Sequence, residues 1–376
     1  MRSKSCPLDI TINFGPRLDY INSHSIDEQV YSAVELFRTV LWRIRSFSLT
    51  VRNRPQAYNA LVLCQVDAPM LQNLTIHVYH AMQDDIYSKP HFPLFNGCTP
   101  SLQTCSLTSF NFGWDPKLMT GLSVLKLGGY FNSFAPSPNT LLEVLRQCPG
   151  LEELSLKNMS GIDTTSCDIL MAEDDVPVTS KIRLPRLKTA SFYYSGLDHA
   201  REIMNHVLFP NLETLELAYL ENVNPLLQEL YAQALTRLPL KKLRIESCLF
   251  SEMKFVNLLR KLPSLSSLQL VDVEDISHIT LKVYKSLSAS TLRPENLLLF
   301  RRCRLTNHGR VLGSRMWRSM GVQRLTGIHC ELLWSPGFQP THKLSGATIP
   351  VSPHSCRQPL QLQRTTRVWR AAIPAR

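Results

Sequence analysis

Nine segments of the chain repeat one order of apolar and polar positions, apolar-x-x-apolar-x-apolar. They open at Ile44, Leu71, Leu102, Leu122, Leu151, Leu187, Leu212, Leu240 and Leu265. All 27 apolar positions of the pattern hold apolar residues and 20 of them hold Leu, in a chain that is 44% hydrophobic. Successive openings are 20 to 36 residues apart. This recurrence indicates a structural unit that is repeated along the chain with irregular length.

Proline residues and helical stretches recur at fixed places around these segments. Pro stands one or two residues before the opening position at Pro69, Pro100, Pro149, Pro185, Pro210, Pro239 and Pro263. Because Pro ends a helix and favours extended backbone, this placement predicts a turn that leads into a strand. Apolar spacing predicts helices over Ser32–Arg43, Leu141–Cys148, Leu197–Leu208, Pro225–Leu238 and Ser251–Leu262. The predicted unit is therefore a helix, a Pro-containing turn and a short strand.

This unit predicts an α/β fold of the leucine-rich-repeat solenoid class, with a parallel β-sheet on the concave side and helices on the convex side. One unit alone cannot bury its apolar edge, whereas stacking places successive strands about 4.8 Å apart in one sheet. We expect nine to ten irregular units over residues 1–310. Residues 311–376 are expected to cap the last unit and to continue as a basic, Pro- and Arg-rich disordered tail.

Alternation of side chains along each strand predicts which residues face the concave side. Since the fourth and sixth positions of the pattern point into the core, residues two, four and six places after the opening one point away from it. They are mostly neutral and hydroxyl-bearing in the first half and of mixed charge later. The candidate protein-binding residues are Lys126, Glu153, Lys157, Tyr193, Glu216, Lys242, Arg244, Glu246 and Gln269. A solvated strand face would carry similar residues, so this alternative stays open.

Charge divides the chain into two parts. Residues 291–376 hold 14 Lys and Arg against two acids, whereas residues 1–290 hold 27 basic and 28 acidic residues. The net charge of +11 therefore comes from the C-terminal segment.

The candidate residues of the concave face indicate the class of partner. Mixed charge beside an aromatic residue is typical of protein interfaces, whereas basic residues dominate a surface that binds a nucleic-acid backbone. We expect a protein partner on the concave face and no nucleic acid there. An RNA-binding Arg tail, or a tail read through an intron or a shifted frame, stays an alternative for the last residues.

No motif of catalysis or cofactor binding accompanies the repeats. The chain lacks G-x-x-x-x-G-K-[ST], G-x-S-x-G and H-E-x-x-H, and none of its ten Cys residues forms a Cys-x-x-Cys pair. We therefore expect no catalytic, metal-binding or cofactor-binding residues, and buried reduced thiols instead. No apolar run is long enough for a membrane span, and the N-terminus does not resemble a signal peptide. These features predict a non-enzyme of the cytoplasm or nucleus with no membrane partner.

The turn-and-strand segments resemble those of a known family. Cys6–Ile12, Ala68–Ile76, Cys148–Leu156, Phe209–Leu217 and Arg302–Asn307 resemble the leucine-rich-repeat region of fungal F-box-like proteins, over residues 6–310. The resemblance implies the substrate-recognition arm of an F-box subunit of a cullin-type ubiquitin ligase. The F-box itself is not found before Cys6, so a ubiquitin-ligase linker is expected as a partner only if a missing F-box is restored. The alternative is a generic leucine-rich-repeat scaffold or regulatory protein with no ubiquitin role.

Overall fold

One long parallel sheet runs through the part of the chain that the computed structural model describes, residues 6–15, 23–79, 93–110, 118–131, 135–160, 181–274, 276–290, 297–301 and 330–331. Its strands are β1 (Leu8–Asn13), β2 (Ile44–Val51), β3 (Asn73–Val78), β4 (Thr104–Thr108), β5 (Val124–Phe131), β6 (Glu153–Ser160), β8 (Thr189–Tyr193), β10 (Thr214–Ala218), β11 (Lys242–Glu246), β12 (Ser267–Val271), β13 (Leu297–Arg301) and β14 (Cys330–Glu331). They lie in this order in the sheet and pair in parallel. A two-stranded parallel sheet joins β7 (Ile182–Arg183) to β9 (Val207–Leu208). The predicted α/β fold with a parallel sheet is confirmed.

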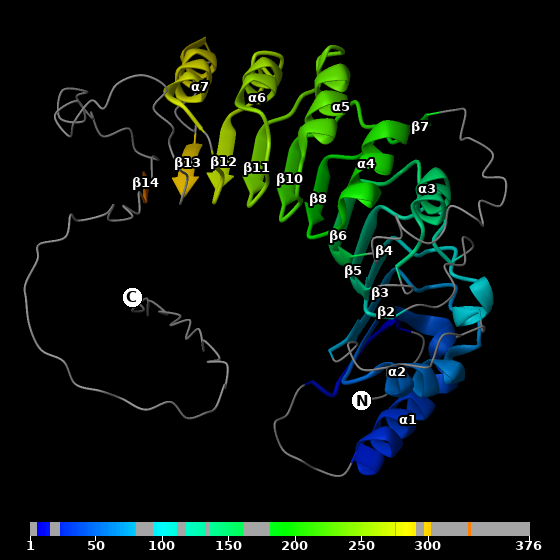
Figure 1. Cartoon of the computed structure of the whole chain (residues 1–376). Coiled ribbons are helices and arrows are strands. Elements are labelled where there is room, and N and C mark those ends of the chain that lie inside the picture. Colours follow the sequence, from blue (N-terminus) through cyan, green and yellow to red (C-terminus); the bar gives the residue numbers. More distant parts are fainter. Residues whose placement is uncertain are drawn as a thin grey trace, which may run out of the picture. The chain divides into compact units, whose positions relative to one another are not determined.

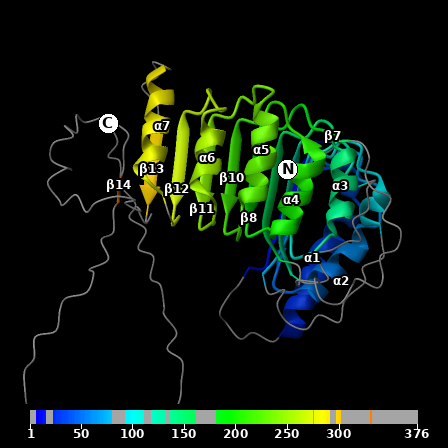
Figure 2. The same cartoon turned by 45° about the horizontal axis from the view of Figure 1, so that its top comes forward.

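Helices connect the strands and lie along one face of the sheet. They are α1 (Ser23–Arg38), α2 (Arg54–Leu61), α3 (Pro138–Arg146), α4 (Leu197–His206), α5 (Asn224–Ala234), α6 (Glu252–Leu259) and α7 (His278–Ser290), with 3-10 helices η1 (Leu41–Arg43), η2 (Val62–Cys64) and η3 (Leu94–Gly97). In Figure 1 the strands follow an arc with α3 to α7 on its outer side, and Figure 2 shows these helices in front of the sheet. We call the opposite side of the sheet, over its described strands, the concave face.

The observed helices differ from the predicted ones mainly at their ends. The predicted helix over Leu197–Leu208 stops at His206, because the next two residues form strand β9. The prediction over Ser32–Arg43 is wrong in part, since α1 spans Ser23–Arg38 and a separate 3-10 turn follows it. Helices α2 and α7 were not predicted from the apolar pattern.

Local sequence explains where α2 and α3 begin. Asn53 and Ser137 have extended backbone, and their side chains accept hydrogen bonds from the N–H groups of Gln56 (2.9 Å) and Thr140 (3.1 Å). A proline follows each cap within the first turn, where a helix needs no N–H. Helix α2 was missed because it has only 8 residues and its start signal stands apart from any clear apolar period.

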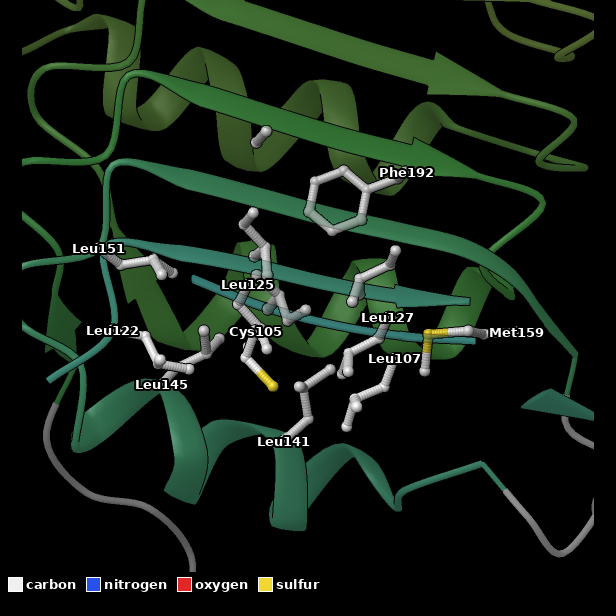
Figure 3. Packing of buried hydrophobic residues seen from close by; sticks show 14 of the residues in the cluster. Cys105, Leu107, Leu122, Leu125, Leu127, Leu141, Leu145, Leu151, Met159 and Phe192 are labelled. Carbon is white, nitrogen blue, oxygen red and sulfur yellow. The ribbon is translucent and has the colours of Figure 1, made fainter. Parts of the chain in front are cut away.

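The apolar positions of the repeated pattern form the core between the sheet and the helices. All 27 are buried, with at most 3% of the residue surface exposed. Those at the fourth position face each other across neighbouring strands, as Phe47, Leu74, Cys105, Leu125, Leu154, Ala190, Leu215, Leu243 and Leu268. Figure 3 shows Leu125 and Leu127 of β5 on the side that faces Leu141 of α3. Burial of one such Leu stabilises the fold by about 1.5–3 kcal/mol. Because a shift of one residue would expose these side chains, this row of fourth-position core residues fixes the strand register.

A left-handed residue recurs at the same place in seven successive units, directly after the strand in five of them and inside β5 and β6 in the other two. It lies four positions after the fourth-position core residue and is Ser109, Gly129, Asn158, Tyr194, Tyr219, Ser247 or Asp272, with φ between 48° and 70°. Its N–H still reaches the next strand, as for Tyr219, which donates to the Glu246 carbonyl at 2.8 Å. Positive φ is costly for residues other than Gly, so the surrounding pairing must hold it. The turn lifts Tyr194 and Tyr219 onto the carboxyl-end edge of the sheet, where both are exposed.

The predicted C-terminal cap and tail, and the predicted absence of a membrane span, can be compared with the described residues. The predicted cap and tail, residues 311–376, lie outside the described residues except for β14, whose Cys330 and Glu331 pair with Phe300 and Arg301 of β13. Among the helices that the structure describes, none has the length and apolar character to cross a membrane.

Truncation of one fourth-position core residue tests the assigned register. Leu215→Ala is expected to lower the free energy of unfolding by about 2–5 kcal/mol, because the site is fully buried and a cavity remains. Thr214→Ala, one position earlier on the other side of the strand, is the matched control and should change it by about 0.5 kcal/mol or less. Equal losses in urea unfolding would show that the two faces of β10 are wrongly assigned.

Glu252, the first residue of α6, joins this helix to the start of α7. Its Oε1 accepts hydrogen bonds from the Ser277 N–H (2.8 Å), the Ser277 hydroxyl (2.9 Å) and the Thr280 hydroxyl (2.6 Å). Burial raises the pKa of this carboxyl, but the hydrogen bonds from Thr280 and Ser277 outweigh burial and hold the pKa below its ordinary value. The folded protein therefore favours the ionised carboxylate, which also suits the N-terminus of α7.

Glu252→Gln is expected to reduce the free energy of unfolding by about 1–2 kcal/mol at neutral pH. A depressed folded-state pKa stabilises the fold above the unfolded pKa, and this contribution disappears as the pH falls through the folded pKa. The difference between wild type and variant, followed by urea unfolding from about pH 7 to about pH 3, should therefore shrink toward zero. Glu221→Gln, at an exposed loop position, is the control. A difference that stays constant with pH would contradict this role of Glu252.

Candidate functional site

All nine candidate residues lie on the concave face, and none is buried. Lys126 comes from β5, Glu153 and Lys157 from β6, Tyr193 from β8, Glu216 from β10, Lys242, Arg244 and Glu246 from β11, and Gln269 from β12. The strand alternation therefore predicted their side of the sheet correctly. Which of them contact each other depends on the register between strands.

Pairing of the strands arranges these residues in rows that cross the sheet. The central row runs Lys126, Ser155, Ser191, Glu216, Arg244 and Gln269. The carboxyl-side row runs Lys157, Tyr193, Ala218, Glu246 and Val271. Since neighbouring strands are about 4.8 Å apart, adjacent members of a row are within reach of each other's side chains.

Arg244 is the centre of the most connected group on this face. Its Nη1 donates to Gln269 Oε1 at 3.1 Å, its Nη2 contacts a Glu246 carboxylate oxygen, and its Nε lies 3.2 Å from Glu216 Oε1. The other oxygen of Glu216 accepts a hydrogen bond from the Ser191 hydroxyl at 2.8 Å. We call Ser191, Glu216, Arg244, Glu246 and Gln269 the Arg244 cluster. Two carboxylates surround one guanidinium, so the cluster has a net negative charge.

Two tyrosines extend the Arg244 cluster toward the carboxyl-end edge. The rings of Tyr193 and Tyr219 meet edge to face, with centroids 5.1 Å apart, and the Tyr219 hydroxyl donates to Glu246 Oε1 at 3.2 Å. Tyr219 thus reaches from Tyr193 to Glu246, on either side of the buried Ala218. Burial and the negative charge of Glu246 raise the pKa of Tyr219, so its hydroxyl stays protonated as a donor. The residue remains 41% exposed.

The remaining candidate residues lie apart from this group. Lys126 pairs with Glu153 across β5 and β6 at 2.8 Å, and both side chains are more than a third exposed. Lys157 and Lys242 are exposed. The structure therefore brings together Tyr193, Glu216, Arg244, Glu246 and Gln269, and leaves the four others as a separate ion pair and two exposed cations.

Sequence reasoning missed Tyr219, which connects the two parts of the site. The residue follows the last strand position that the pattern assigned to the concave face. One signal was available, because Tyr194 and Tyr219 occupy the same place after consecutive pattern segments. Its left-handed φ of 54°, which turns the ring back over the sheet, is not readable from the sequence.

The N-terminal half of the concave face has a different character. Its strands β2 to β4 present mainly hydroxyl groups, including Ser48, Thr75 and Ser106. His77 is partly buried and meets Tyr79 edge to face, with ring centroids 4.5 Å apart. Burial lowers the pKa of His77, so its ring is neutral at physiological pH. This half therefore has few charges to attract a charged partner.

Metal binding needs several His, Cys, Asp or Glu side chains that lie together, and thiol chemistry needs an accessible Cys with a lowered pKa. In the described part of the chain, no cluster of three or more His, Cys, Asp or Glu side chains is placed to hold a metal ion. Cys64, Cys105, Cys148 and Cys248 are buried free thiols, as predicted, whereas Cys6 is exposed. Burial raises the pKa of Cys105 to about 12, so this thiol is not a nucleophile at neutral pH.

A double-mutant cycle tests whether the Arg244 cluster forms in solution. The cycle of Arg244→Ala with Glu246→Ala is expected to give a coupling energy of about 0.5–1.5 kcal/mol in urea unfolding, since the pair is close and partly exposed. The cycle of Lys157→Ala with Glu246→Ala is the control and should give a value near zero, because three strand steps separate these residues. Equal coupling in both cycles would contradict the observed contacts.

Comparison with known proteins adds no family to this description. A scan of the chain against protein-family models gives no match, and a search of curated proteins gives none. The side chains of the concave face themselves therefore indicate what the face can bind.

Proposed function

We propose that the chain is a leucine-rich-repeat solenoid that binds a protein partner on its concave face and has no catalytic activity. Three features support the solenoid. The strands pair in chain order, the fourth-position core residues lie opposite one another, and a left-handed turn recurs at one position in seven units. Such features are expected where each unit packs only against its neighbours.

The Arg244 cluster with Tyr193 and Tyr219 is the observation that carries the binding proposal. Tyr and Arg are enriched at protein interfaces and dominate their binding energy. Here they are accessible to a partner and already held by hydrogen bonds and ring contacts. Since fewer side-chain rotamers must be fixed on binding, the entropic cost of association is reduced.

The electrostatics of the cluster favour a protein over a nucleic acid. A phosphate backbone is bound by several Lys or Arg side chains whose positive charge is available. The guanidinium of Arg244 is instead neutralised by Glu216 and Glu246. A phosphate at this place would meet two carboxylates, whereas a peptide segment offers both donors and acceptors.

The cellular role proposed is that implied by the resemblance to fungal F-box-like proteins. In that role the concave face recognises the substrate of a cullin-type ubiquitin ligase in the cytoplasm or nucleus, and the ligase linker binds only where an F-box is restored. The second candidate is a scaffold or regulatory protein with no ubiquitin role. An in-frame F-box exon in the transcript, with copurification of the ligase linker by the extended product, would separate the two.

Reversal of charge on the concave face tests the binding proposal. Arg244→Glu with Glu246→Arg in the full chain is expected to lose at least about 90% of the partner captured by the wild type, as contacts at an interface centre dominate affinity. Lys254→Glu with Glu229→Arg, on helices α6 and α5, is the matched control and should retain it. Capture would be quantified by mass spectrometry. Partners that all remain bound to the concave variant would refute a concave binding site.

A further inference from the structure

We propose that the partner of the concave face presents an extended segment with a basic side chain, Arg or Lys, that lies against Tyr219 and Glu246. The same segment carries an acidic side chain about four residues away, which contacts Lys157. This inference rests on the proposed protein-binding function and specifies the chemistry of the partner.

The group of charged residues that Tyr219 joins through Glu246 has an excess of negative charge. Glu216 and Glu246 share the single guanidinium of Arg244. Asp272, at the end of β12, adds a third carboxylate, which accepts a hydrogen bond from the Ser247 hydroxyl at 3.1 Å. Each oxygen of Glu246 has one hydrogen-bond contact, to Tyr219 or to Arg244, and a carboxylate oxygen has two lone pairs. The group therefore retains acceptor capacity and a field that attracts a cation.

The ring of Tyr219 completes a site for a cation. It is 41% exposed and is fixed by its contacts with Tyr193 and Glu246. A cation over an aromatic ring is attracted by the negative face of the ring, and charge-assisted hydrogen bonds to a carboxylate add to this attraction. An anionic side chain at this place would be repelled by Glu246, and Arg244 is already hydrogen-bonded to Gln269 and paired with two carboxylates.

Positive charge marks the other end of the same row. Lys157 is exposed and pairs in register with Tyr193. Three strand steps, from β6 through β8 and β10 to β11, separate it from Glu246. At about 4.8 Å a step this is roughly 14 Å, which an extended chain at about 3.4 Å per residue covers in about four residues. A segment that crosses the strands can thus satisfy both ends at once.

Selection from a random peptide library on the immobilised full chain tests this inference. Peptides of about 12 residues, long enough to cross the four strands, would be selected on the wild type and sequenced. The expected result is enrichment of Arg or Lys with Asp or Glu about four positions away. Glu246→Gln should weaken the selected peptides about tenfold in fluorescence anisotropy, because the carboxylate charge is lost while an acceptor for Tyr219 remains.

A further variant tests the acidic end of the segment, and another serves as its control. Lys157→Glu should weaken the same peptides, and replacing their acidic residue by Lys should restore affinity for this variant alone. Lys254→Glu, on the exposed side of α6, is the control and should leave affinity unchanged. A circular dichroism melt within a few degrees of the wild type would be required of each variant before affinities are compared.

The outcomes distinguish this inference from the proposed function. Selected peptides that lose affinity for Tyr219→Ala but carry no basic residue would overturn the cationic partner and leave concave binding intact. Peptides with a basic residue whose affinity is unchanged by Glu246→Gln would also overturn it. Failure to select any peptide, or binding that no concave substitution weakens, would count against both.

Discussion

The register of apolar side chains across the sheet is the constraint on which the rest of the structure depends. Residues such as Leu154, Leu215 and Leu243 are buried beside apolar residues at the same position of the neighbouring strands. A shift of one residue in any strand would turn its leucines to solvent and its polar residues into the core. The same register places Glu216, Arg244 and Gln269 side by side on the opposite face, so the core determines the geometry of the surface.

Sequence reasoning predicted the strands well because their signal is local. The order of three apolar positions fixes both where a strand lies and which face of it is buried, and this held at every position from Ile44 to Leu270. Helix ends were predicted less well. Val207 and Leu208 continue an apolar period that looks helical, yet the small sheet with β7 draws them into a strand. Such a tertiary contact overrides local preference.

The composition of the concave face was predictable, but its interactions were not. Glu216 lies 28 residues before Arg244 and Gln269 lies 25 after it, so each contact spans one unit of unequal length. The pattern in a single sequence does not show which side chains of neighbouring strands contact each other until the strands are paired. Tyr219 could not be placed for a further reason, since its ring direction follows from a positive φ that only the turn after β10 imposes.

Parallel pairing in chain order also governs how this protein would respond to force. Among the described residues, each strand of the long sheet pairs only with its neighbours in the order of the sheet, and no described strand links the two ends of the sheet. Tension applied at the ends would load the strand pairs in series rather than all at once. The chain would then lengthen stepwise, as one unit after another peels from an end, and the remaining units would keep their own core.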